Sequence, residues 1–97
     1  MIEIKEYSEK VKIQESDLLG KSRRSHIALC REMYWFYLNK AQKYTMKHIA
    51  YKFNRSQSTI SSGIKCVSGL IEMNHFKVSD SIKILDIKND FIVMKKK

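Results

Sequence analysis

The alternation of apolar and polar residues between positions 45 and 64 predicts two helices joined by a tight turn. In the first helix, apolar side chains recur at i, i+3, i+4 and i+7, the spacing of one helical face. These residues are Met46, Ile49, Ala50 and Phe53. Asn54 tolerates a left-handed helix end, and Ser56 can cap a second helix. In that helix, Ile60 and Ile64 form an i, i+4 pair that can pack onto the first.

The other positions of the second helix carry small polar side chains, which have little reason to cluster unless their face meets something polar. They are Gln57, Ser58, Thr59, Ser61 and Ser62. We therefore predict a helix-turn-helix over about residues 45–72, in which the start of the second helix meets base edges in the major groove. The alternative interpretation is an ordinary helical hairpin with a solvated polar face.

Residues 27–40 contain the longest apolar segment, IALCREMYWFYLN, and helical spacing within it predicts the central buried helix. Four consecutive aromatic residues lie in this segment, at positions 34–37. Aromatic rings can form a platform on which nucleic-acid bases stack. At helical spacing beside aliphatic residues, however, these four are far more typical of a hydrophobic core.

Shorter helices are expected towards the N-terminus. Apolar residues among alternating Lys and Glu predict an amphipathic helix from about Glu3 to Lys10. Ser16-Asp17 can cap a brief helical turn that Gly20 ends. Residues 21–26 are basic and unpatterned, so we expect an exposed loop whose arginines reach phosphates or a narrow A·T-rich minor groove. A solvated connector is the alternative.

The C-terminal residues 79–97 have two interpretations. A helix capped by Ser79 or Asp80 would align one apolar stripe. The stripe consists of Ile84, Ile87, Phe91 and Met94. The β-branched content also allows a hairpin that turns at Asn89-Asp90, but we favour the helix. The prediction for the whole chain is an all-α fold, a compact helical bundle that forms one domain over residues 1–97.

The net charge of +9 is concentrated in the middle of the chain. Between residues 21 and 65 there are ten basic residues and a single acid, Glu32, whereas the basic and acidic residues of the two flanks cancel. All the excess charge therefore surrounds the predicted helix-turn-helix. Such a segment suits a polyanionic partner, and its binding should weaken steeply with salt as counterions are released. A basic solubility surface is the alternative, but it does not explain this localisation.

Nothing in the sequence indicates catalysis or a bound cofactor. No Ser/His/Asp set, Gly-rich phosphate loop or carboxylate pair stands out, and His26 with Cys30 would supply only two metal ligands. Cys30 and Cys66 suit reduced thiols, packed as small hydrophobes in a cytoplasmic chain. No apolar run is long enough to span a membrane, and no signal-peptide pattern is present. A monomer is expected, because no coiled-coil seam is present.

Several segments resemble, in order and with nearly the same spacing, the C-terminal DNA-binding domain (domain IV) of the bacterial replication initiator DnaA. They are DLLGKSR at 17–23, Arg31 with the apolar run after it, TMKHIAYKF at 45–53, RSQSTISSGIKCV at 55–67 and DIKNDF at 86–91. The resemblance implies an all-α fold with a helix-turn-helix related to that of the Trp repressor, and double-stranded DNA as partner. It also implies that Arg23 enters the minor groove. Arg55, Ser58 and Thr59 match further positions of the family's motif.

The sequence departs from this family where bases are read. Ser56-Gln57 stands in place of the family's Asp-His pair, and Ser62 in place of its second His. Lys47 replaces a helix-starting Pro, and Asn54 alone replaces a Gly-Gly turn. Because a Gln side chain can form two hydrogen bonds with adenine, Gln57 predicts an altered target sequence.

We therefore predict sequence-specific binding of double-stranded DNA, related to the recognition of a replication origin or its regulation. The candidate DNA contacts are Lys21, Arg23, Arg24, Arg31, Lys43, Lys47, Arg55, Ser56, Gln57, Ser58, Thr59 and Ser62. Lys40, Lys52 and Lys65 are further candidates for phosphate contacts. Two alternatives stay open: a module that binds a replication protein through the same scaffold, and a general binder of RNA or other polyanions.

Overall fold

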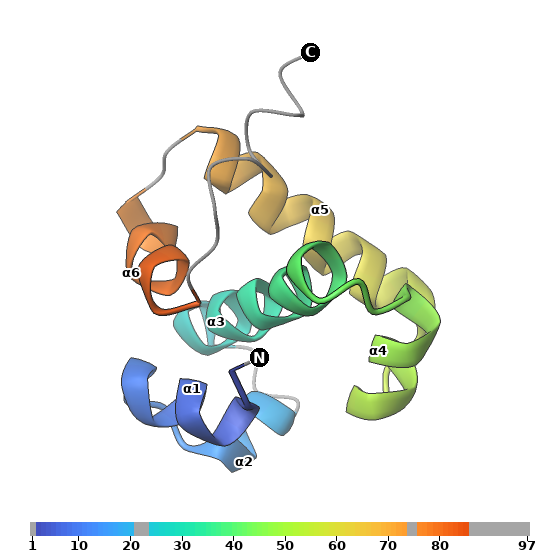
Figure 1. Ribbon diagram of the computed structural model, residues 1–97, viewed down its shortest axis with the longest axis horizontal. Coiled ribbons are helices and arrows are strands. Elements are labelled where there is room, and N and C mark those ends of the chain that lie inside the picture. The colour runs from blue at the N-terminus through green and yellow to red at the C-terminus, as the bar shows by residue number, and fades with distance from the viewer. Residues whose placement is uncertain (1, 21–23, 74–75, 86–97) are drawn as a thin grey trace.

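Two helices, α3 and α5, pack together at the centre of the fold, and shorter helices surround them (Figure 1). The structure, a computed structural model, describes residues 2–20, 24–73 and 76–85. Its elements are α1 (Ile4–Val11), α2 (Glu15–Leu19), α3 (Ser25–Phe36), the π-helical turn η1 (Tyr37–Ala41), α4 (Met46–Phe53), α5 (Gln57–Glu72) and α6 (Phe76–Ile84). Every element of the described residues is helical, so the predicted all-α bundle is confirmed. None of the described helices is long and apolar enough to cross a membrane.

The predicted central helix is the largest contributor to the core. The hydrophobic residues that α3 and η1 bury are Cys30, Met33, Tyr34, Trp35, Phe36, Tyr37 and Leu38. The four aromatic residues at 34–37 are therefore core residues and not a stacking platform. Tyr34 stacks on Tyr7 of α1 with ring centroids 5.3 Å apart, and Trp35 meets Phe53 of α4 edge to face at 6.0 Å. The core thus joins α1 and α4 through α3.

Buried hydroxyl groups connect the two ends of the described chain to α3. The Tyr7 hydroxyl donates a hydrogen bond to the Cys30 carbonyl at 2.9 Å and lies 3.1 Å from Ser81 Oγ of α6. The Tyr34 hydroxyl donates to the carbonyl of Ile2 at 2.7 Å, and the Ile2 N–H donates to Tyr37 Oη at 2.9 Å. These contacts hold α1 and α6 against α3, and α6 also packs against α5.

Several predicted boundaries are wrong. Gln14, not Ser16-Asp17, is the N-cap of α2, and Asp17 lies in the first turn, where a carboxylate favours the positive end of the helix dipole. The predicted loop at 21–26 is wrong at its end, because α3 already begins at Ser25, and residues 21–23 lie outside the described residues. The last turn of the central helix is π-helical, and Cys66 is exposed rather than packed.

The C-terminal helix also differs from its prediction. It begins at Phe76, before Ser79 and Asp80, and ends at Ile84. The strand that the hairpin interpretation requires around Ile82 and Ile84 is therefore excluded, since both lie within a helix. The rest of the expected apolar stripe and the alternative turn at Asn89-Asp90 lie outside the described residues.

Candidate nucleic-acid interface

The turn between α4 and α5 has the geometry that its sequence predicts. Thr45 caps α4, since its Oγ1 accepts a hydrogen bond from the His48 N–H at 3.1 Å. Asn54 ends the helix in the left-handed conformation with φ of 55°. The N–H of Arg55 then donates to the Ala50 carbonyl at 2.8 Å. The predicted left-handed helix end is confirmed, and it directs the chain straight into α5.

The first turn of α5 is capped by Ser56, as predicted. Ser56 Oγ accepts a hydrogen bond from the Thr59 N–H at 3.2 Å, and it lies 3.1 Å from Ser58 Oγ and 2.9 Å from Thr59 Oγ1. The predicted polar side chains of this face are exposed at Ser56, Gln57, Ser58, Thr59 and Ser62, and half-buried at Ser61. The start of α5 therefore presents hydroxyl and amide groups to solvent.

The opposite side of α5 holds this turn against the core. Ile60 and Ile64 are buried, as predicted. Gly63 lies against the indole of Trp35: a Cβ built at this position would be 2.9 Å from Cε3 and from Cζ3 of the ring. Because glycine has no Cβ, α5 can approach α3 closely enough to bury its apolar face.

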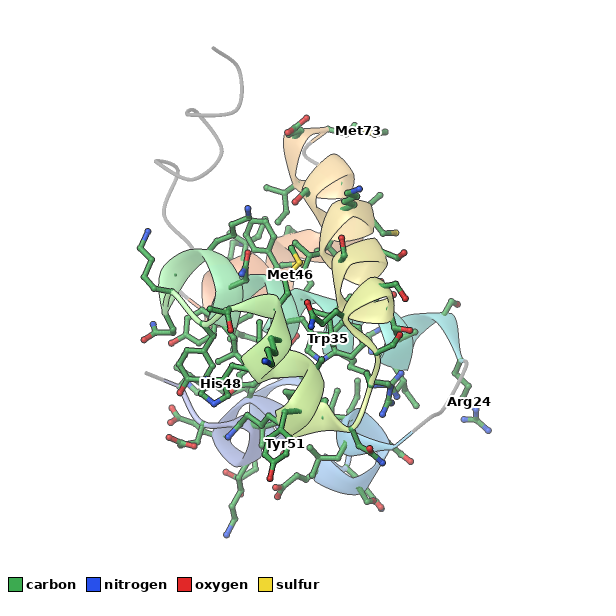
Figure 2. The ribbon with its side chains drawn as sticks, turned by 90° about the vertical axis from the view of Figure 1, so that its right-hand side faces the viewer. Arg24, Trp35, Met46, His48, Tyr51 and Met73 are labelled. Carbon is green, nitrogen blue, oxygen red and sulfur yellow. The ribbon has the colours of Figure 1, made fainter. Side chains whose placement is uncertain are left out.

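Most of the predicted basic contacts that the structure describes are exposed. Arg24 is exposed at the start of α3 and extends away from the body of the molecule (Figure 2). Others lie on α4, on α5 and in the segment before α4. They are the exposed Lys43, Lys47, Lys52 and Lys65 and the half-buried Lys40. Lys21 and Arg23 lie outside the described residues.

Arg31 differs from its prediction as a DNA contact. It is 6 % exposed, and its guanidinium is directed inward onto α2. Nε donates to the Leu18 carbonyl and Nη2 to the Asp17 carbonyl, both at 2.8 Å. Burial lowers the pKa of Arg31, and the nearby charge of Arg55 lowers it further. Arg31 thus binds the end of α2, a role that its charge alone does not reveal.

Arg55 also binds carbonyl groups in this structure. It is half-buried, and Nη1 donates to the carbonyl of Phe53, the last residue of α4, at 2.8 Å. Nη2 donates to the Gly20 carbonyl, just after α2. The turn of the helix-turn-helix is therefore attached to Gly20, the C-cap of α2.

Comparison with known protein families decides what this arrangement belongs to. The family model for the bacterial dnaA protein helix-turn-helix matches residues 4–67. The chain belongs to this family. The match extends from α1 into α5 and so includes the turn, the first turn of α5 and both arginines. Membership of the DnaA helix-turn-helix family supports DNA binding, and the domain that defines this family is a DNA-binding domain rather than a catalytic one. No curated protein and no solved structure matches the chain.

Sequence analysis missed an aromatic face on the outer side of α4. The rings of Tyr44 and His48 stack in parallel, with centroids 4.6 Å apart and an interplanar angle of 4°. Tyr51 is 88 % exposed on the same side of the helix (Figure 2). His48 and Tyr51 are at i and i+3 on α4, a helical-face signal, whereas Tyr44 precedes the N-cap Thr45 and reaches this face from outside the helix.

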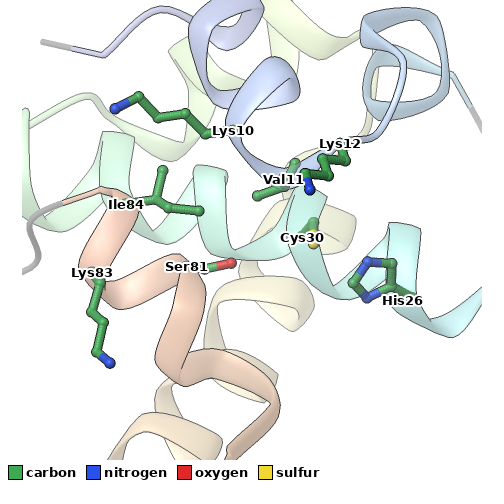
Figure 3. A pocket seen from close by; sticks show the side chains of 8 residues that line it. All are labelled: Lys10, Val11, Lys12, His26, Cys30, Ser81, Lys83 and Ile84. Atoms are coloured by element: carbon green, nitrogen blue, oxygen red, sulfur yellow. The ribbon is translucent and has the colours of Figure 1, made fainter.

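A separate pocket of about 540 Å³ lies between α1, α3 and α6 and includes no residue of the helix-turn-helix (Figure 3). Its basic lining residues are Lys10, Lys12, His26 and Lys83. Cys30 also lines it, and burial raises the pKa of this thiol. Although His26 and Cys30 share the pocket, the described residues contain no group of three or more His, Cys, Asp or Glu that could hold a metal.

Proposed function

We propose that this chain is a sequence-specific binder of double-stranded DNA, acting as a monomeric single domain in the cytoplasm in the recognition of a replication origin or its regulation. The observation that supports this most directly is the first turn of α5, polar and exposed, in a chain of the DnaA helix-turn-helix family. In helix-turn-helix proteins this turn lies in the major groove, where base pairs present distinct hydrogen-bonding patterns.

In this proposal, residues of the first two turns of α5 read bases. The side-chain amide of Gln57 can form two hydrogen bonds with one adenine: Nε2 donates to N7, and Oε1 accepts from N6. The hydroxyls of Ser58, Thr59 and Ser62 are exposed beside it. Because Ser56 and Gln57 replace the Asp-His pair of the family, the preferred site differs from the family's own box.

The basic residues position the protein on the duplex. As the family resemblance implies, Arg23 enters the minor groove, Lys21 and Arg24 are further DNA contacts near it in sequence, and Lys43 and Lys47 contact phosphates. The position of the lysines supports a role in phosphate contact. Lys43 precedes α4, Lys47 lies on it, both are exposed, and both belong to the segment that carries all the excess charge. Phosphate contacts carry no sequence information and should act equally on every duplex.

The test is a fluorescence-anisotropy titration of duplexes of equal length at two salt concentrations. One duplex carries the A·T-rich box of the DnaA family, one carries a scrambled box, and a third carries the site obtained by unbiased selection with this protein. We expect the selected site to bind most tightly. Gln57→Ala should weaken binding to it by about 1–3 kcal/mol and leave the scrambled duplex unchanged. Equal affinity for all three duplexes would contradict the proposal.

The aromatic face of α4 favours one other candidate function, a module that binds a replication protein. Tyr51 is among the exposed large apolar residues of the described chain, and the Tyr44–His48 stack adjoins it. Exposed aromatic side chains are typical of protein interfaces. A specific complex with a replication initiator or helicase, abolished by Tyr51→Ala, together with only random DNA binding, would favour this function over the first.

A further inference from the structure

A stacked pair of rings is held in place at the entrance to α4. Tyr44 lies in the segment between η1 and α4, and its ring stacks on that of His48, in the first turn of the helix. The N–H of Tyr44 donates to the Leu38 carbonyl at 2.9 Å, and the Tyr44 carbonyl accepts from Asn39 Nδ2 at 2.8 Å. Because both backbone groups of Tyr44 are bonded to η1, the pair has a defined position before any ligand binds, which lowers the cost of binding.

The backbone on either side of Tyr44 has an uncommon conformation. η1 is a π-helical turn, a rare form that often occurs at functional sites. Lys43, directly before Tyr44, has φ of 64°, in the left-handed region that side chains other than glycine seldom adopt. Directly after Tyr44, Thr45 caps α4. The chain thus turns sharply around Tyr44 and brings its ring onto the outer side of α4.

A third ring continues this surface along the helix. Tyr51 is 88 % exposed and lies on the same side of α4 as His48, which is also exposed (Figure 2). Side chains three residues apart on a helix have Cβ atoms about 5–6 Å apart. Neighbouring planar groups of one ligand can therefore stack on His48 and on Tyr51.

Each of the three rings has a lysine as its direct neighbour in the sequence. The pairs are Lys43-Tyr44, Lys47-His48 and Tyr51-Lys52. All three lysines are exposed, and no acidic residue occurs between positions 33 and 71. A ligand that suits this surface therefore carries negative charge and planar groups at short, regular intervals. A single nucleic-acid strand does so, because its bases are unpaired and each is attached to a phosphate, whereas a duplex hides the faces of its bases within the stack.

We propose that the outer side of α4 binds single-stranded nucleic acid. Bases stack on His48 and Tyr51, Tyr44 supports the imidazole from its other side, and Lys47 and Lys52 contact the phosphates. The inference goes beyond the proposed function, which concerns a duplex and the first turn of α5, and it does not rest on it.

The test is a fluorescence-anisotropy titration of the full chain with three labelled strands of about 12 nucleotides. They are an oligodeoxyuridine, an oligouridine, and an abasic strand that has the phosphates and sugars but no bases. We expect at least one base-bearing strand to bind about fivefold or more tightly than the abasic strand, since one stacked base contributes at least about this factor. A difference between the first two strands supports the inference and distinguishes DNA from RNA. Equal affinity for all three strands would overturn it.

Tyr51→Ala and Tyr51→Phe are the matched variants. Because Tyr51 is exposed, neither substitution disturbs the core. Tyr51→Ala should weaken binding of the base-bearing strand by about fivefold or more and leave the abasic strand unchanged, whereas Tyr51→Phe keeps a ring and should keep the affinity. Met73→Ala removes another exposed apolar side chain, at the end of α5, and should change neither strand. A Tyr51→Ala protein with the full wild-type preference for bases would overturn the inference.

The salt dependence separates stacking from charge. Tyr51→Ala removes no charge, so the slope of log affinity against log salt for the base-bearing strand should stay at the wild-type value. Lys52→Ala removes a phosphate contact, and the slope should fall by about 0.7. An unchanged slope in Lys52→Ala would contradict the phosphate contact assigned to this lysine.

The duplex separates this inference from the proposed function. Tyr51→Ala should bind the selected duplex with wild-type affinity. Wild-type protein that binds no duplex but prefers base-bearing strands would remove the proposed function alone. Wild-type protein that binds the selected duplex but does not distinguish the abasic strand would remove this inference alone. A complex with a replication protein that needs Tyr51, without any preference for base-bearing strands, would assign the face to the second candidate function and overturn the inference.

Discussion

Gly63 lies where α5 packs against the indole of Trp35, and this close contact predicts that a larger residue at position 63 destabilises the fold. A methyl group at Gly63 would meet the buried ring at 2.9 Å, and Phe53 holds that ring from another side. Overpacking of this kind costs about 1–3 kcal/mol, which exceeds the gain of about 1 kcal/mol that alanine brings to a helix. Gly63→Ala should therefore lower the free energy of unfolding, measured by urea titration with circular dichroism.

Gly69 provides the matched control for this prediction on the same helix. Apart from its chain neighbours and the nearby backbone of α5 itself, no atom lies within 4 Å of where a Cβ at Gly69 would be. Gly69→Ala should therefore show the helix-propensity gain alone, a stabilisation of about 0.5–1 kcal/mol. Stabilisation by both substitutions would mean that the Trp35 ring can move aside at little cost, contrary to the packing described above.

Because Tyr7 is buried, we expect the free energy of unfolding to fall as the pH rises into the alkaline range. Burial raises the pKa of Tyr7, as it does for Tyr34. Below the ordinary tyrosine pKa of about 10, the phenol is neutral in both states and its contribution is fully present. Above that pH the unfolded chain ionises first, so the unfolding free energy falls by about 1.4 kcal/mol per pH unit for each such tyrosine.

The variant Tyr7→Phe tests this dependence by urea unfolding between pH 8 and 11. At pH 8 it should be less stable by about 1–3 kcal/mol, since the Cys30 carbonyl and the Ser81 hydroxyl lose a buried partner. Its stability should nevertheless fall less steeply above pH 10 than that of the wild type. An equal slope in the two proteins would assign the alkaline loss to other groups.

At the scale of elements, Ser56 determines where α5 begins. Its side chain accepts the Thr59 N–H, which would otherwise lack a partner within the helix. Ser56→Ala should cost about 1 kcal/mol of stability. Ser62 is an exposed serine of the same helix, beyond its first turn. Ser62→Ala should therefore change the free energy of unfolding by less than about 0.5 kcal/mol. Equal destabilisation by the two substitutions would refute the capping role.

The elements that sequence analysis predicts correctly are those that local signals define. The apolar stripe of α4, the left-handed Asn54 and the cap at Ser56 each depend on residues within about one or two turns. The prediction that Cys66 is packed is wrong. It rested on the residue type alone, whereas Cys66 lies off the buried face formed by Ile60, Ile64 and Val67 and is exposed.

The carbonyl contacts of Arg31 and Arg55 were not predicted, for a different reason. Arginine is seldom buried, and three of the four carbonyl partners of Arg31 and Arg55 are 13 to 35 residues away. Nothing in the local sequence specifies such a pairing, because any residue has a carbonyl. The exposed side chains of the candidate site are thus predictable on a regular helix, as in the first turn of α5. The contacts at the end of α2 are not, because there backbone carbonyls meet side chains that are distant in sequence.

At the scale of the whole molecule, the distribution of charge separates a DNA-binding face from a generally basic surface. Five lysines, at 40, 43, 47, 52 and 65, are candidates for phosphate contacts in the basic middle of the chain. If all of them displace counterions, log affinity for duplex DNA should fall with log salt at a slope of about −4.5. Single-stranded DNA and RNA of the same length should bind more weakly than the duplex.

Lys43→Ala and Lys5→Ala are the matched pair that tests this distribution. Both lysines are exposed, but Lys5 lies on α1, outside the basic middle of the chain. Lys43→Ala should weaken binding to specific and scrambled duplexes alike and reduce the salt slope by about 0.9, whereas Lys5→Ala should leave affinity and slope unchanged. If the two substitutions act equally, net charge alone governs binding, and the helix-turn-helix face has no privileged place on the duplex.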